Sequence, residues 1–138
     1  MRVFPLNVVL PALALLAAAQ ASAADRCADA ADQTAMTACY EKALKASDAA
    51  LNASYREIEG RLADDPETRK RLVGAQKAWI AFRDAECRFS TAAVEGGSIE
   101  PTLTAICLQE MTAARTAELK GYLACEEGDM SCPVPPAQ

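Results

Sequence analysis

Two cysteines stand at equal distances from the second glycine of a pair, and this spacing constrains the fold more than any other feature of the sequence. Cys87 precedes Gly97 by ten residues, and Cys107 follows it by ten. If helices enter and leave the glycine turn as an antiparallel hairpin, the two cysteines come level with each other, as a disulfide requires. The spacing therefore predicts a Cys87–Cys107 bridge between two neighbouring helices.

The chain has six cysteines, and an even number in an exported protein is typical of a disulfide set. They are Cys27, Cys39, Cys87, Cys107, Cys125 and Cys132. Besides Cys87–Cys107, the sequence favours the local pairs Cys27–Cys39 and Cys125–Cys132. Because the first four gather at one end of the expected fold, Cys27–Cys107 with Cys39–Cys87 is the alternative. No metal, cofactor or redox-active dithiol is expected, because the sequence has no CxxC pair and no histidine.

The first residues have the pattern of a targeting segment. Arg2 gives a positive start, residues 8–19 form a short apolar run, and Ala21-Ser22-Ala23 is a small-x-small cleavage site. The run is too short to favour a membrane span, and the three residues before Cys27 are not the lipobox of a lipoprotein. We therefore expect residues 1–23 to be a cleaved signal peptide. The product would be periplasmic or secreted, without a membrane anchor.

The exported part is expected to be one acidic domain. Cleavage would leave 115 residues, Ala24 to Gln138, which is enough for a single core. Losing Arg2 lowers the number of Lys and Arg from 14 to 13 against 19 Asp and Glu, so the net charge becomes about −6. An acidic surface argues against nucleic acid and anionic membranes as partners, and it is compatible with a cationic protein.

Composition and pattern predict an all-α fold. The sequence is rich in good helix formers and lacks the alternation of β-branched residues that marks strands. Short connections make neighbouring helices antiparallel. We expect a small, disulfide-braced antiparallel three-helix bundle over residues 24–124, followed by an irregular Pro-containing tail over residues 125–138.

Local signals set the bounds of the three expected helices. The first begins with Asp32 as its N-cap and extends to about residue 63. Asp65 caps the second, Pro66 takes its first position, and this helix extends to about residue 94. Pro101 opens the third, which ends near residue 124.

Each expected helix carries an inward stripe with helical spacing. The stripes are Met36, Tyr40, Ala43, Ser47, Leu51, Ser54, Ile58 and Leu62; Leu72, Ala75, Trp79, Phe82, Glu86 and Phe89; and Leu108, Met111, Arg115, Leu119 and Tyr122. We interpret Trp79, Phe82 and Phe89 as core, and an exposed aromatic anchor for a partner is the alternative. Gly74 would allow a close helix contact.

Two short motifs precede the glycine turn in order. The first is Asp48-Ala-Ala-Leu51-Asn52-Ala-Ser-Tyr55, and the second, AQKAWIAFRDAEC, runs from Ala75 to Cys87. Together with the glycine pair and Cys107, they resemble the LprI-like lysozyme-inhibitor N-terminal domain family over roughly residues 27–122. The resemblance implies an exported protein whose namesake inhibits lysozyme and so protects the cell wall. That namesake is a lipoprotein, and this chain departs from it in lacking the lipobox.

A set of polar side chains occupies inward-looking helix positions. Its members are Asp48, Asn52, Gln76, Arg83, Asp84 and Arg115, with Tyr55 beside them. A buried arginine is costly unless it is paired, so Arg115 is expected to contact a carboxylate on another helix. We interpret the set as a structural network that fixes helix register, and a recognition surface is the alternative.

The segment between the second and third helices is the best candidate for partner recognition. The candidate binding residues are Glu95, Gly96, Gly97, Ser98 and Glu100. Two glycines allow a tight exposed backbone, and the expected disulfide behind them would hold it rigid, which lowers the entropic cost of binding. The two glutamates could face a basic protein. A simple helix connector is the alternative interpretation.

No catalytic residues are expected. Without histidine, Ser-His and Cys-His pairs are excluded and the commonest general base is missing. The adjacent acids Asp64 and Asp65 are better explained by a helix cap. The leading hypothesis is a non-catalytic protein whose partner is a protein, with lysozyme implied by the family. The alternative is an envelope interaction or stress module with a different protein partner.

Overall fold

The computed structural model describes residues 27–137 of the chain. The expected signal peptide, residues 1–23, lies outside them. Three long helices make up the fold, namely α2 (Gln33–Arg61), α3 (Pro66–Ser90) and α4 (Glu100–Leu123), and a short 3-10 turn, η1 (Ala92–Val94), follows α3. Residues 27–137 contain no strand, so the all-α class is confirmed. None of their helices is both long and apolar enough to span a bilayer.

Aspartate caps begin α2 and α3, as the sequence predicts. The Oδ1 atom of Asp32 accepts a hydrogen bond from the Ala35 amide at 2.8 Å, and Oδ1 of Asp65 accepts one from the Thr68 amide at 3.0 Å. Pro occupies the first turn of α3, where a missing N–H costs no hydrogen bond. α3 ends at Ser90, earlier than expected, because the backbone then tightens into η1.

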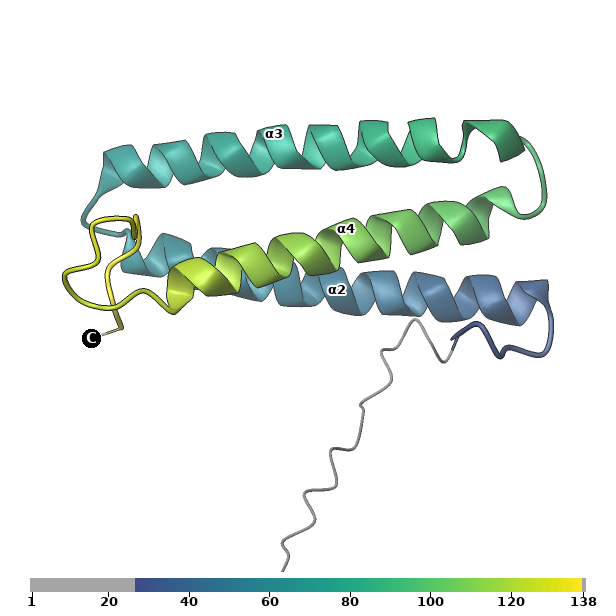
Figure 1. Ribbon diagram of the computed structural model, residues 1–138, viewed down its shortest axis with the longest axis horizontal. Coiled ribbons are helices and arrows are strands. Elements are labelled where there is room, and N and C mark those ends of the chain that lie inside the picture. The colour runs from purple at the N-terminus through teal and green to yellow at the C-terminus, as the bar shows by residue number, and fades with distance from the viewer. Residues whose placement is uncertain (1–26, 138) are drawn as a thin grey trace, which may run out of the picture.

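Residue pairs in contact fix the helix directions (Figure 1). Pairs between α2 and α4 keep a separation of 62 to 65 residues, as in Thr37–Thr102, Ser47–Gln109 and Arg61–Leu123, so these helices run parallel. Pairs between α3 and α4 instead keep a nearly constant sum of residue numbers, as in Arg83–Thr112 and Gln76–Arg115. α3 is therefore antiparallel to both other helices.

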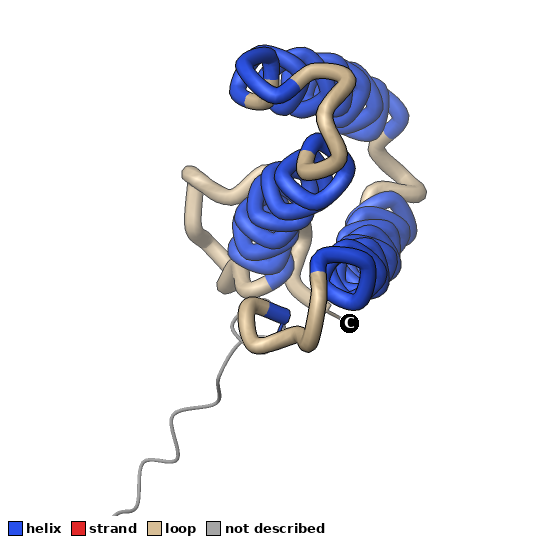
Figure 2. The backbone as a smooth tube through the Cα atoms, turned by 90° about the vertical axis from the view of Figure 1, so that its right-hand side faces the viewer, coloured by secondary structure: helices blue, strands red, loops and turns tan. Residues whose placement is uncertain are grey.

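The three helices are packed unevenly. Seen end-on, the three helices lie at the corners of a triangle, with one set apart from the other two (Figure 2), and the contacts identify the one set apart as α3. The contact of α4 with α2 is extensive, and its contact with α3 is much smaller. The expected α2 stripe is confirmed: six of its eight members are buried, and Met36 and Ser47 are half-buried.

The core consists of two apolar clusters at opposite ends of the α2–α4 pair. One contains Leu51, Ile58, Leu62, Leu119 and Val134, and the other contains Cys27, Tyr40 and Ala105. Between them α4 buries Thr112, and Ser47 meets Gln109, so the middle layer is polar. Small apolar clusters stabilise a fold in proportion to the area they remove from water, so this fold relies on its cross-links as well.

The expected α3 core is wrong at its two phenylalanines, although Leu72 packs against the core as expected. Phe82 is 58% exposed and Phe89 is 76% exposed, whereas Gln76 and Cys87 are buried. The physical reason is the disulfide: Cys87 must face α4, and residues one and three turns before it, Arg83 and Gln76, then face inward too. Phe82 and Phe89 are rotated away from that line. Trp79 alone of the three aromatics packs against the core.

Two smaller expectations also fail. Gly74 makes no close helix contact, because a Cβ placed there would meet nothing within 4 Å. The α4 stripe fails only in part: Leu119 is fully buried as expected, but Tyr122 is 38% exposed and the helix also buries Thr102, Thr112 and Thr116. Threonine tolerates this burial by bonding its own helix, as the Thr116 hydroxyl does when it donates to the Thr112 carbonyl at 2.8 Å.

The structure contains the local disulfide set: Cys27–Cys39, Cys87–Cys107 and Cys125–Cys132, with Cα–Cα distances of 5.5, 5.7 and 5.7 Å. The alternative pairing of the first four cysteines is not the one present. The Cys87–Cys107 bridge joins α3 to α4 and supplements their small contact. On the chain-entropy estimate, a bridge that closes a loop of this size stabilises the fold by about 3 kcal/mol.

The C-terminal tail packs against the core although it forms no helix or strand up to residue 137. Val134 is 4% exposed and lies against Leu119 and the end of α2. Arg61 donates from Nη1 to the Leu123 carbonyl at 2.9 Å, so α2 also caps the end of α4. The tail therefore closes one end of the fold.

Val134→Ala should lower the free energy of unfolding by about 1–2 kcal/mol, because it opens a cavity in an apolar cluster. Met130→Ala is the matched control in the same tail, since Met130 is fully exposed, and its effect should stay within about 0.5 kcal/mol. Denaturant melts measure both. Equal effects would show that the tail does not contribute to the core.

Acid should weaken the cap of α3. The Thr68 amide hydrogen bond lowers the pKa of Asp65 below its ordinary value, so the cap stabilises the fold above the unfolded pKa of about 3.9 and loses this effect as the pH falls through the folded pKa. Asp65→Asn keeps a capping acceptor but does not titrate. The stability advantage of the wild type over this variant should shrink below about pH 4 in thermal melts. A difference that stays constant from pH 7 to pH 2 would contradict the assignment.

Candidate functional site

The segment between α3 and α4 forms a tight turn at one end of the molecule (Figure 1). Gly96 has φ +75°, a conformation that favours glycine, and a Cβ on Gly97 would lie 2.9 Å from the Val94 carbonyl oxygen. The Gly97 amide donates to that same oxygen at 2.9 Å. Both glycines are exposed. The turn thus presents backbone to solvent in a shape that other residues would strain.

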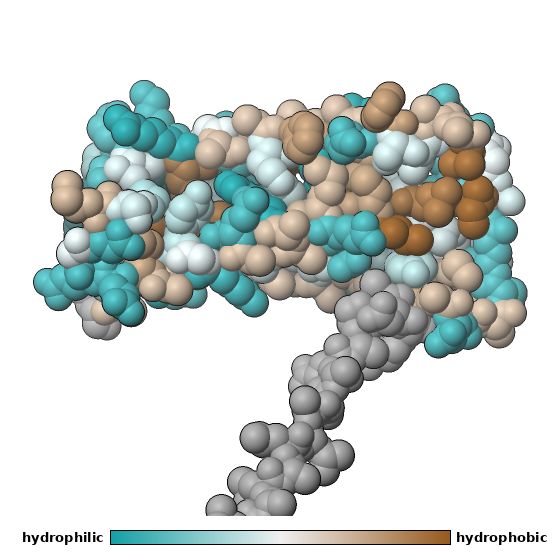
Figure 3. Space-filling model, viewed as in Figure 1, coloured by the Kyte–Doolittle hydropathy of each residue, from teal (hydrophilic) through white to brown (hydrophobic). Residues whose placement is uncertain are grey.

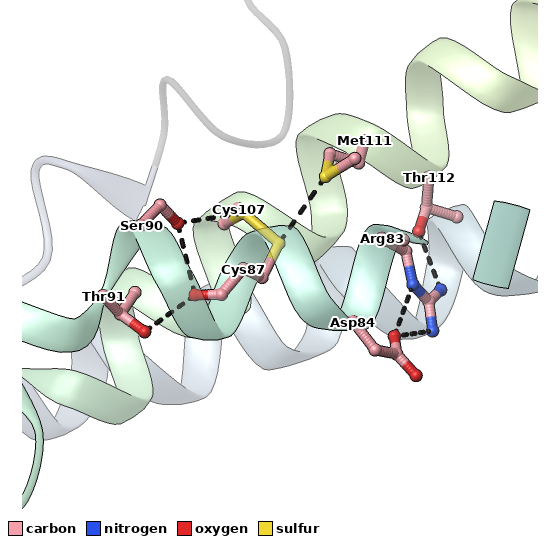
Figure 4. The surroundings of a disulfide bond; sticks show 8 residues. All are labelled: Arg83, Asp84, Cys87, Ser90, Thr91, Cys107, Met111 and Thr112. Carbon is pink, nitrogen blue, oxygen red and sulfur yellow. Dashed lines mark hydrogen bonds and ion pairs between the residues drawn. A yellow bond between two sulfur atoms is a disulfide. The ribbon is translucent and has the colours of Figure 1, made fainter. Parts of the chain in front are cut away.

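Several contacts brace the turn from behind, as Figure 4 shows for the α3 side. The Thr91 hydroxyl donates to the Cys87 carbonyl at 2.8 Å, which ties η1 to the half-cystine below it. On the other side, Gln33 at the start of α2 donates its side-chain amide to the Ser98 carbonyl. The turn is therefore fixed to all three helices. A recognition loop held in this way loses little conformational entropy on binding.

The two glutamates of the turn differ in their availability. Glu95 is exposed. Glu100 is half-buried, and its Oε2 accepts a hydrogen bond from the Gly96 amide at 2.7 Å. The sequence predicted that both would face a partner, but Glu100 serves the turn itself. Of the two, Glu95 is the carboxylate that is free to meet one.

The polar network is organised around Arg83. Its guanidinium donates to Asp84 at 2.9 Å, to Asp48 of α2 at 3.3 Å and to the Thr112 hydroxyl of α4 at 3.1 Å. It also lies 5.3 Å from the ring centroid of Trp79, within the range of a cation–π contact. Arg83 and two of these partners are drawn in Figure 4. One side chain thus joins all three helices.

Arg115 forms a second, smaller link, and its expected partner is corrected. Its side chain is 11% exposed, but the carboxylate it contacts is Glu118 on the same helix, at 2.8 Å. Across to α3 its Nε donates to Gln76 Oε1 at 3.3 Å, a neutral acceptor. The carboxylates of Asp48 and Asp84, which lie on the other two helices, are nearer the glycine turn, and Arg83 already contacts them. Arg115 therefore holds α3 by an amide and not by an ion pair.

An open groove of about 420 Å³ separates α2 from α3 beside this network. The first motif lines one wall with Asp48, Asn52 and Tyr55, and Gln76 belongs to the other. Asn52 is exposed there, so it is not part of the buried network as expected. Burial raises the pKa of Tyr55, and the nearby Glu59 carboxylate raises it further. The groove offers hydrogen-bonding groups, and with no histidine in the chain it offers no Ser-His or Cys-His nucleophile pair.

Sequence reasoning missed two groups of residues. The first is the set of buried threonines of α4, which are hard to predict because a polar side chain is usually assigned to the surface. The second is the outward face of α3, which could have been predicted. Because the predicted disulfide turns Cys87 toward α4, Phe82 and Phe89 must point away from the core.

Comparison with known proteins found one matching family and a curated relative. The family model described as "Lysozyme inhibitor LprI" matches residues 24–119. A protein of Rhizobium meliloti (strain 1021), described as uncharacterised, is 34% identical in an alignment that covers 88% of this chain and 99% of the relative. No solved structure matches the chain significantly.

Replacing the central arginine should loosen α3. Arg83→Met leaves the buried Thr112 hydroxyl without its donor, and a lost buried partner of this kind costs about 1–3 kcal/mol of unfolding free energy. Arg83→Lys should recover only part of that loss, because lysine lacks the planar fork that reaches several acceptors. Arg88→Met is the matched control on the same helix, since Arg88 is exposed. Equal losses in denaturant melts for Arg83→Met and Arg88→Met would refute the role of Arg83.

Proposed function

Because the chain belongs to the LprI lysozyme-inhibitor family, we propose that it is an exported protein that binds lysozyme and inhibits it without catalysing a reaction. The family match carries this proposal. It begins at residue 24, directly after the expected cleavage site, which supports export to the periplasm or the exterior. Inhibition there would protect the cell wall.

The glycine turn is the proposed contact surface. To block an active-site cleft, an inhibitor needs a protruding element of fixed shape, and the turn at residues 95–100 is the exposed, braced element at one end of this fold. Gly96 and Gly97 allow close approach of backbone to a partner. The Gly96–Glu100 hydrogen bond and the Gln33–Ser98 contact hold the shape. The turn would enter the cleft as a preformed unit.

Charge supports the choice of a cationic partner. Residues 24–138 carry 13 bases and 19 acids, a net charge of about −6. From residue 83 to 110 the acids are Asp84, Glu86, Glu95, Glu100 and Glu110, against Arg83 and Arg88, so the part of the chain around the turn is acidic as well. Opposite charges accelerate association and are screened by salt. Binding should therefore slow as ionic strength rises.

A turbidity assay of lysozyme with the purified protein tests the function, and one exposed carboxylate tests the site. Glu95→Lys should raise the half-inhibitory concentration roughly tenfold, equivalent to about 1.4 kcal/mol, and should flatten the salt dependence. Glu127→Lys is the matched control, because it makes the same charge change at an exposed position in the tail. Glu100→Lys is unsuitable as a test, since it would also break the turn's own hydrogen bond.

The outcomes separate function from site. Inhibition that is weakened equally by both variants would indicate an effect of net charge alone, and inhibition unchanged by Glu95→Lys would move the contact elsewhere on the surface. Failure of the wild-type protein to inhibit either animal-type or goose-type lysozyme would contradict the proposed function. That result would favour the alternative, an envelope interaction or stress module with another protein partner.

A further inference from the structure

The outward face of α3 carries an apolar seam that nothing in residues 27–137 covers. Its members are Ala75, Ala78, Phe82, Ala85, Phe89 and, just beyond the helix, Ala92, and all of them are exposed. Their spacing alternates between three and four residues, which is the heptad pattern of helices that pack side by side. The seam lies on the opposite side of α3 from Gln76 and Cys87, which face the core.

The two phenylalanines make this seam unusual for a surface. Phe82 is 58% exposed and Phe89 is 76% exposed, and apolar side chains protrude along the α3 edge in Figure 3. Large exposed apolar groups in a row mark interaction surfaces. α3 also buries few of its own residues inward, and helices draw most of their stability from packing a face. A partner on the outer face would supply what the inner face lacks.

We propose that the seam binds a second copy of this chain, with the two α3 helices antiparallel about a two-fold axis. In that arrangement residues whose numbers add to 167 come opposite each other. Phe82 then meets Ala85 of the second copy, and Phe89 meets Ala78. Each large side chain faces a small one, the alternation by which facing helices interdigitate. A parallel pair would instead set phenylalanine against phenylalanine and leave gaps between the alanines.

Charge favours the same orientation. Residues 66–77 of α3 carry Arg69, Lys70, Arg71 and Lys77 against Glu67, a net charge of +3, whereas residues 78–95 carry Asp84, Glu86 and Glu95 against Arg83 and Arg88, a net charge of −1. A parallel pair would place the two basic halves side by side. In the antiparallel register Glu95 of one copy comes beside the first half of the other α3, near Arg71, which gives complementary potentials there. The opposed helix dipoles add to this preference.

The geometry also sets the strength of the contact and the location of the two glycine turns. In this register only residues 77–90 of the two α3 helices lie side by side, so the helix contact is about 21 Å long and one helix wide. A contact of this size falls below the roughly 1,200 Å² of a standard stable interface, so self-association should be weak and reversible. Because the helices oppose each other, the two glycine turns would lie at opposite ends of the pair.

A size swap across the seam tests the proposal. Phe82→Ala leaves two alanines facing each other, and Ala85→Phe sets two phenylalanines in collision, so sedimentation equilibrium of each purified single variant should show a dimer dissociation constant raised about tenfold or more. The double variant Phe82→Ala/Ala85→Phe restores a large residue opposite a small one. Its dissociation constant should return to within about threefold of the wild type. Met130→Ala, which removes an exposed apolar side chain from the tail, is the control and should change nothing.

Three results would overturn the proposal. The first is a wild-type protein that stays monomeric up to about 1 mM. The second is a double variant that associates no better than either single variant. The third is unchanged self-association in every seam variant together with a loss of lysozyme inhibition, which would assign the seam to lysozyme. Since these positions are exposed, all variants should keep the wild-type helical content, and circular dichroism checks this.

Discussion

Arg83 projects from α3 into the space where the three helices come together, and the position of α3 depends on it. Its guanidinium reaches Asp48 on α2 and Thr112 on α4, and its own neighbour Asp84 completes the set. A single planar fork can satisfy several acceptors at fixed angles, so the contact specifies register as well as distance. Asp48 and Asp84 remain partly solvated, at 44% and 42% side-chain exposure, so we attribute specificity to the network more than large stability.

In the rest of the fold, α2 and α4 form a well-packed pair, and α3 is attached to this pair at a few points. α2 and α4 share two apolar clusters and the buried tail residue Val134, whereas α3 is held by the Cys87–Cys107 bridge, Arg83 and the Gln76–Arg115 hydrogen bond. The same bridge that compensates for sparse packing also braces the glycine turn. The position of α3 and the shape of the proposed contact surface thus share one cross-link, and the apolar groups that α3 does not bury inward remain available outside.

Much of this arrangement could be predicted from the sequence because its signals are local. Asp32, Asp65 and Pro66 set helix starts through their own backbone geometry, and the symmetric spacing about Gly97 gives the bridge. Phe82 and Phe89 were wrongly predicted to be core because two neighbouring lines of residues run along α3, Ala75–Phe82–Phe89 and Gln76–Arg83–Cys87. Hydrophobicity favours the first, and the disulfide selects the second. The role of Glu100 could not be predicted, because its contact with Gly96 depends on how the turn closes.

Native-state hydrogen exchange tests most directly whether α3 is attached at points and not by a continuous core. At a concentration low enough to exclude self-association, amides of α3 before Trp79 should open at a lower free energy than those buried in α2 and α4, and amides beside Cys87 should be better protected than the start of the helix. Arg83→Met should widen this gap without changing exchange in the centre of α2. Uniform protection of all three helices at the global free energy of unfolding would contradict the account, because α3 would then belong to one cooperative core.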